Sequence, residues 1–172
     1  GPKCGPGVGA RAGSPALSGG GGRLSHASGP GKAGGYAGAL GSLDKVELYP
    51  WSEEDAFLAY LDELVNYEDS EGLESVVELV PPFVGKAIPG SAAFKLGYNY
   101  GFICGSIRAN RIPLILSRPQ DWQKGLPGLQ GITGNPRKKK LRDHAVRLFP
   151  SLKGVTLKTC DALLILNHHL SH

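Results

Sequence analysis

Along the first half of the chain, the spacing of apolar residues changes from a strand period to a helix period and back. Residues 46–49 alternate apolar and polar side chains, as a short strand does. Between 56 and 65 the apolar residues recur three and four positions apart, which predicts a helix with one buried face. Ser52 and Asp55 have the spacing of a capping box, so this helix is expected to begin at Ser52. The mostly apolar run 75–80 precedes two prolines and predicts a buried strand.

The second half of the chain continues the alternation. The expected elements are a helix at 91–110, a strand at 112–117, and helices at 136–149 and 161–170. In the first of these helices Gly97, Gly101 and Gly105 recur every four residues, which predicts close packing against the sheet or a nucleic-acid backbone. Strands that alternate with helices indicate an α/β fold with a central sheet covered by helices.

The amino-terminal segment 1–43 lacks this periodicity. It holds 15 of the chain's 26 glycines, and no Asp or Glu occurs in it. Such a composition buries too little apolar surface to offset the entropy of ordering the chain, so we expect a disordered glycine-rich segment. Its Ala, Ser and Arg content suits both the remnant of an organelle transit peptide and a plain tail. Residues 44–172 are then expected to form one domain.

Charge is unevenly distributed along the chain. Residues 1–43 carry a net charge of +4, residues 44–80 carry −11 and residues 81–172 carry +11, which gives the overall +4. This asymmetry indicates a nucleic-acid partner, although helices with solvated charged faces are the alternative. The three cysteines fit neither a disulfide framework nor a zinc site, and no apolar run is long enough to predict a membrane span.

Two carboxylates stand at the edges of apolar runs, where desolvation makes an unpaired charge unfavourable. Glu78 lies near the end of a predicted strand, and Asp161 opens the last predicted helix. Strand ends and helix starts meet at one edge of an α/β sheet, so the two side chains are expected to hold Mg²⁺, or Mn²⁺ in its place. The alternative for Asp161 is a helix cap or first-turn acid without a metal.

Basic and aromatic residues follow in the same half of the chain. Lys138, Lys139 and Lys140 form a run that can neutralise several phosphates. The segment 118–123 places Trp122 beside cationic and amide groups, a mixture suited to DNA contact, although Trp122 fits a core position equally well. The residues expected to bind DNA are Lys95, Arg118, Gln120, Trp122, Lys138, Lys139 and Lys140.

Five blocks of the chain, in order, resemble the RuvC-like Holliday junction resolvases, and in particular their plastid (monokaryotic chloroplast) branch. The blocks are ELVPP at 78–82, FKLGYNYG at 94–101, RPQDWQ at 118–123, KKKLRDHAVRLFP at 138–150 and CDALLI at 160–165. The resemblance implies an RNase H-like fold with a central mixed sheet flanked by helices. It also implies a homodimer that nicks four-way DNA junctions with Mg²⁺, in the chloroplast nucleoid or alternatively in mitochondria.

Carried over by position, the resemblance assigns Glu78 to the second catalytic carboxylate and Asp161 to the last. It places Lys95 and the lysine run along the DNA path, and the 94–101 helix near the junction or the dimer surface. Members of the family begin with a strand that carries an Asp in a Gly-Ile-Asp-Pro-like motif, and segment 1–43 has no acid to match it. They also carry Asp or His about one turn before the last Asp, where this chain has residues 156–158 without either.

The resemblance therefore predicts a resolvase domain whose first strand or strands are missing and whose catalytic site is incomplete. Three functions follow from the sequence. The first is a junction-resolving endonuclease, the second is a non-catalytic protein that binds branched DNA, and the third is another RNase H-like nuclease that acts on RNA or flaps.

Overall fold

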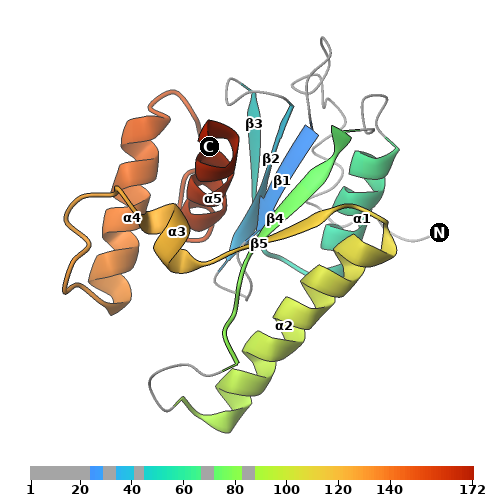
Figure 1. Ribbon diagram of the computed structural model, residues 1–172, viewed down its shortest axis with the longest axis horizontal. Helices are drawn as coiled ribbons and strands as arrows, with labels where there is room; N and C mark the ends of the chain where they lie inside the picture. The colour runs from blue at the N-terminus through green and yellow to red at the C-terminus, as the bar shows by residue number, and fades with distance from the viewer. Residues whose placement is uncertain (1–23, 29–33, 41–44, 67–71, 83–87) are drawn as a thin grey trace.

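The computed structural model of the protein describes residues 24–28, 34–40, 45–66, 72–82 and 88–172. Five strands form one sheet in the order β3-β2-β1-β4-β5, and helices cover both of its faces (Figure 1). The strands are β1 Leu24–Ser28, β2 Gly35–Leu40, β3 Val46–Pro50, β4 Glu74–Glu78 and β5 Leu114–Ser117. The helices are α1 Glu54–Val65, α2 Gly90–Ala109, α3 Pro119–Gln123, α4 Gly134–Leu148 and α5 Cys160–Ser171. Among the described residues, no helix is both long and apolar enough to cross a membrane.

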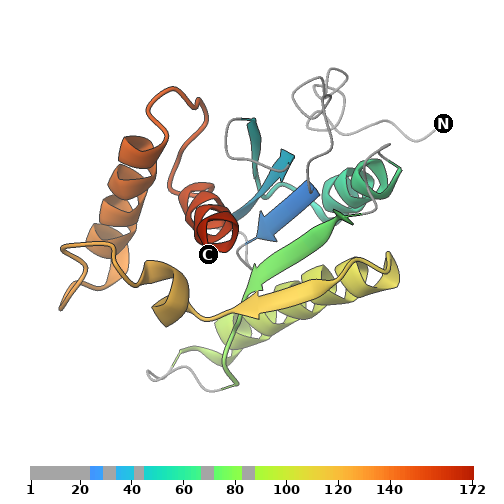
Figure 2. The same ribbon diagram turned by 45° about the horizontal axis from the view of Figure 1, so that its top comes forward.

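The sheet is mixed. Strands β3, β2 and β1 pair antiparallel, whereas β1, β4 and β5 pair parallel. Helices α1 and α2 pack on one face and α3, α4 and α5 on the other, an arrangement that Figure 2 shows from above. The predicted α/β fold with a central mixed sheet between helices is therefore present.

Successive side chains of a strand point to opposite faces of the sheet, so the core consists of two clusters. Tyr36 and Val77 point towards α1 and α2 and join a cluster of aromatic and aliphatic side chains. Their neighbours Ala37 and Val76 point to the opposite face and pack against α5. Helix α5 is buried along most of its length, since it lies across the middle of the sheet.

The prediction that segment 1–43 is disordered and that the first strands are missing is wrong for two strands. Strand β1 lies in the middle of the sheet, between β2 and β4, and β2 pairs with β3. The apolar content of β2 is low because its inward residues are Ala37 and Ala39, both fully buried beneath α5. Small residues let the helix approach the strand, and the bulky side chains of α5 supply the apolar contact. Residues 1–23, 29–33 and 41–43, with any transit peptide, lie outside the described residues.

Three local predictions also need correction. Helix α1 is capped by Glu53 without a side-chain hydrogen bond, so the capping box predicted at Ser52 is not formed. The short helix α3 follows β5 directly and was not predicted. A methyl group built at Gly97, Gly101 or Gly105 would meet nothing within 4 Å, so the sheet does not pack closely against this stripe.

Gly35 offers a test of the corrected amino-terminal part. A Cβ atom at this position would contact the backbone carbonyl of Tyr49 and lie 2.9 Å from that of Lys158, and backbone cannot easily yield. We expect Gly35→Ala to lower the free energy of unfolding by about 1 to 2 kcal/mol, as overpacking does. Gly101→Ala is the matched control: it fills open space in a helix and should stabilise by about 1 kcal/mol. Urea unfolding with equal midpoints for Gly35→Ala and the unmodified protein would contradict the β2–β3 packing.

Candidate functional site

Glu78 and Asp161 come together on the face of the sheet that α5 covers. Glu78 is the last residue of β4 and has the same parity as Val76, which packs against α5. Asp161 lies in the first turn of α5. The negative charge of Asp161 raises the pKa of Glu78, as expected of two neighbouring carboxylates. Their convergence agrees with the strand-end and helix-start argument, and their catalytic role stays a prediction.

The surroundings of Glu78 favour the protonated form of its carboxyl group. Burial and, second, the charge of Asp161 raise its pKa from 4.5 to about 7. The indole nitrogen of Trp122 donates a hydrogen bond of 3.0 Å to the Glu78 carboxylate, which together with the charge of Lys138 limits the rise. Near neutral pH, Glu78 is therefore present both protonated and ionised.

Lys138 is the cation of this cluster. Its ammonium group forms an ion pair with Oδ2 of Asp161, although the two residues come from different helices, α4 and α5. The two side chains are only 26% and 21% exposed, so the pair is partly shielded from water. Next to it, burial and the charge of Asp161 raise the pKa of Cys160 to about 12, which leaves the thiol protonated and a poor nucleophile at neutral pH.

The residues of this cluster and their arrangement do not fit the Mg²⁺ site of a nuclease that the resemblance implies. Among the described residues, no group of three or more His, Cys, Asp or Glu side chains could hold a metal ion. Strand β1 is present but has the sequence LSHAS, and the whole of segment 1–43 contains no acid. Lys158, one turn before Asp161, is an exposed cationic residue at the place where the RuvC-like resolvases carry Asp or His. Two carboxylates that are already hydrogen bonded or ion paired are too few ligands for two metal ions.

Trp122 does not present its ring to solvent. It is 3% exposed and belongs to the core cluster beneath the sheet, where its indole supports Glu78. A DNA base cannot stack on a buried ring, so the predicted DNA contact of Trp122 is wrong and the core alternative is correct. Arg118 and Gln120 are exposed, and Arg118 donates two hydrogen bonds to Asp121, at 3.0 and 3.1 Å.

The three lysines 138–140 of α4 do not all lie on the same face of the helix. Lys138 has the same face as Leu141 and Ala145, three and seven residues on, which are buried, and this spacing is the sequence signal for its inward position. Lys139 and Lys140 are exposed, and Lys140 donates to the carbonyl of Gly128 at 3.1 Å. A DNA role of the two exposed lysines stays a prediction.

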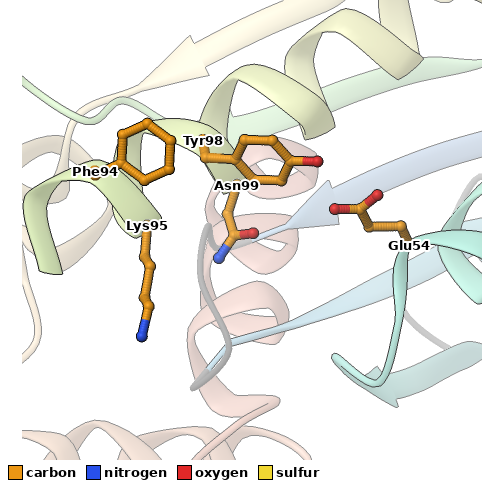
Figure 3. Close-up of a pocket in the computed structure, with 5 residues that line it drawn as sticks. All are labelled: Glu54, Phe94, Lys95, Tyr98 and Asn99. Carbon is orange, nitrogen blue, oxygen red and sulfur yellow. The ribbon is translucent and has the colours of Figure 1, made fainter. Parts of the chain in front are cut away.

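Lys95 lies apart from this cluster. It projects from α2, on the face of the sheet opposite to α4, beside a hollow that Phe94, Tyr98, Asn99 and Glu54 also line (Figure 3). The hydroxyl of Tyr98 points towards Glu54, and a hydrogen bond between them raises the pKa of Tyr98. The structure therefore does not bring Lys95 and the α4 lysines onto one face of the sheet.

Comparison with solved structures identifies proteins of the same fold. RuvC of T. thermophilus in complex with a Holliday junction substrate matches with a TM-score of 0.53 and 17% identity, over 86% of this chain and 92% of that one. A second Thermus thermophilus RuvC structure matches with a TM-score of 0.52 and 15% identity, over 85% and 92%. No protein-family model matches the chain, and no curated protein matches it significantly. The chain thus has a mixed α/β fold similar to that of RuvC.

Proposed function

We propose that the protein binds branched DNA, with the four-way junction as its preferred ligand, and that it does so without cutting the DNA. The observation that carries this proposal is the incomplete acidic site: Glu78 and Asp161 lie together, yet β1 supplies no carboxylate. The RuvC-like fold supports a junction as the ligand, because the neighbour of known structure is bound to one. A site with two carboxylates, one of them ion paired, lacks the ligands that two-metal hydrolysis requires.

The exposed Lys and Arg side chains of α4 are the proposed contact with the DNA backbone. Lys139, Lys140 and Arg147 are all exposed on this helix, and among the described residues none of them forms an ion pair that a phosphate would have to displace. Phosphate contacts set affinity rather than sequence preference, which suits a protein that recognises the shape of a junction. Arg118, directly before α3, and Lys95, on the opposite face of the sheet, are further candidates.

A gel-shift and cleavage assay on one labelled junction tests this proposal. We expect binding in EDTA and in Mg²⁺ alike, weaker binding to a duplex of the same sequence, and no nicked product with Mg²⁺ or Mn²⁺. The closeness of Glu78 and Asp161 favours a second function, a junction-resolving endonuclease. Symmetric nicks that need Mg²⁺ and disappear in both Glu78→Gln and Asp161→Asn would establish that function instead. Cleavage of a flap or an RNA–DNA hybrid alone would point to a different nuclease.

In this proposal the protein is a homodimer, and its two subunits contact each other along α2. This helix exposes Phe94 by 72% and Tyr98 by 52%, and the two rings stack on each other, 6.3 Å apart. Large apolar side chains on a helix face are typical of a protein interface.

Replacing these two aromatic residues tests the dimer. We expect Phe94→Asp with Tyr98→Asp to raise the dissociation constant of the dimer at least about tenfold, because an interface loses its apolar anchors and gains buried charge. Sedimentation equilibrium across a range of concentrations measures the shift. Val146→Asp, an equally simple change at a 44% exposed position of α4, is the control and should leave the dimer intact. A monomeric unmodified protein would contradict the proposed assembly.

We propose that the protein acts on organellar DNA, in the chloroplast nucleoid or alternatively in mitochondria, as the resemblance to the plastid branch implies. Residues 1–23, which precede β1, contain no Asp or Glu, and this composition suits a transit segment. A fluorescent protein fused to the carboxyl terminus should co-localise with organellar DNA stain. Diffuse fluorescence outside both organelles would exclude this compartment while leaving the binding activity to be judged by the junction assay.

A further inference from the structure

The acidic pair needs a cation to be stable where it lies. Glu78 and Asp161 are both only partly exposed, and burial and then the charge of Asp161 disfavour ionisation of Glu78. In a nuclease such a pair is neutralised by metal ions, which form the strongest local charges of the site. Here the described residues provide a cation from within the chain.

Lys138 is held at this position by more than its ion pair. On the same helix, Leu141 and Ala145 anchor α4 in the core. The neighbouring Arg137 donates to the carbonyls of Leu129 and Ile132, which ties the start of α4 to the preceding loop. The ammonium of Lys138 therefore approaches Asp161 from a fixed helix, and its charge also acts on Glu78.

We propose that the ammonium group of Lys138 takes the place of a metal ion between Asp161 and Glu78, so that this site excludes divalent and trivalent cations. The inference deepens the proposed function, on which it rests, because it explains how a site without cleavage activity keeps its two carboxylates. A metal ion would have to displace the ammonium from Asp161 and would find no third carboxylate among the described residues. Removal of the ammonium leaves two carboxylates that a hard cation can bind.

Terbium luminescence tests this directly, without DNA. Trp122 donates a hydrogen bond to Glu78, so its excited indole can sensitise Tb³⁺ bound to the carboxylate pair. We expect almost no sensitised emission from the unmodified protein and at least about tenfold tighter Tb³⁺ binding by Lys138→Met, which keeps the aliphatic stem but loses the charge. Adding Asp161→Asn to Lys138→Met should abolish the emission.

Two further variants separate the local effect from a general loss of charge. Lys139→Met removes a neighbouring exposed charge and should show the same lack of Tb³⁺ emission as the unmodified protein, and Lys138→Arg should do the same because the cation remains. Thermal unfolding with Mn²⁺ gives an independent readout: Mn²⁺ should raise the melting temperature of Lys138→Met and not that of the unmodified protein.

Strong Tb³⁺ emission from the unmodified protein that Asp161→Asn removes would overturn the inference, whether or not Lys138→Met folds. Equal affinities of the unmodified protein and a folded Lys138→Met would overturn it as well. The junction assay is independent of these outcomes. Junction binding with metal at the carboxylates would refute only the role of Lys138, and loss of junction binding with metal excluded would refute only the proposed function.

Discussion

At about pH 8, replacing Glu78 with glutamine is expected to raise the free energy of unfolding by about 3 kcal/mol. The carboxyl has an ordinary pKa of 4.5 in the unfolded chain, and burial and the charge of Asp161 raise it to about 7 in the fold. The folded protein therefore binds a proton that the unfolded chain releases. Glutamine is uncharged, has nearly the same shape and still accepts the hydrogen bond from Trp122.

The pH dependence follows from linkage between protonation and folding. Below pH 4.5 Glu78 is protonated in both states, so it imposes no penalty on the fold. As the pH rises from 4.5 to about 7, the unfolded chain loses its proton first, and the stability contributed by the protonated group is lost. The stability difference between Glu78→Gln and the unmodified protein should thus grow over this interval and stay constant above it.

Urea unfolding in EDTA at three pH values, one below, one within and one above this interval, measures the difference. Other titrating groups cancel because both proteins contain them. Glu53→Gln is the control, since Glu53 is exposed and its side chain caps nothing, and it should show no such growth with pH. A Glu78→Gln protein that is less stable than the unmodified one at high pH would show that the ionised carboxylate is stabilised in the fold.

Removing the two exposed lysines of α4 is expected to weaken junction binding about 30-fold at ~0.15 M salt, relative to the unmodified protein. The double variant Lys139→Met with Lys140→Met loses two phosphate contacts and the release of two counterions. Each contact contributes about 0.9 to the slope of log affinity against log salt concentration, so the slope should fall by about 2. The two binding curves should converge as salt is raised.

Fluorescence anisotropy with a labelled junction at several salt concentrations gives both quantities. Lys45→Met is the control that removes one exposed lysine elsewhere: Lys45 is exposed and precedes the edge strand β3, away from α4. An unchanged slope in the double variant would move the DNA-binding surface to another part of the chain. A loss of affinity at all salt concentrations alike would indicate a folding defect instead.

Apart from the short helix α3, the elements from β3 onwards were predictable because each has a strong local pattern. The alternation at Val46–Pro50 and the apolar faces of α1, α4 and α5 depend on neighbours three or four residues away, or two in a strand. Strands β1 and β2 lack such a pattern, because LSHAS and GYAGAL contain few large apolar residues. They are strands because the sheet on both sides of β1 provides hydrogen-bond partners, and that is a long-range condition.

The candidate site was likewise only partly predictable from the sequence. Glu78 and Asp161 could be found from the sequence, since each stands at the edge of an apolar run. Their partners could not. Trp122 is 44 residues from Glu78 and Lys138 is 23 from Asp161, and nothing local distinguishes a core Trp from one that stacks on DNA. The spacing of Lys138 from Leu141 and Ala145 indicates that Lys138 faces inward, but nothing in the sequence indicates that it pairs with Asp161.

By itself, the sequence determined the α/β alternation, the absence of acid before residue 44 and the two carboxylates that end one apolar run and begin another. These are properties of composition and of spacing within a few residues. Only the tertiary structure decided that glycine-rich residues complete the sheet and that the acidic pair meets an ammonium group from α4. The physical reason is that burial and charge pairing depend on the separation of atoms in space, and the fold brings together residues that are far apart along the chain.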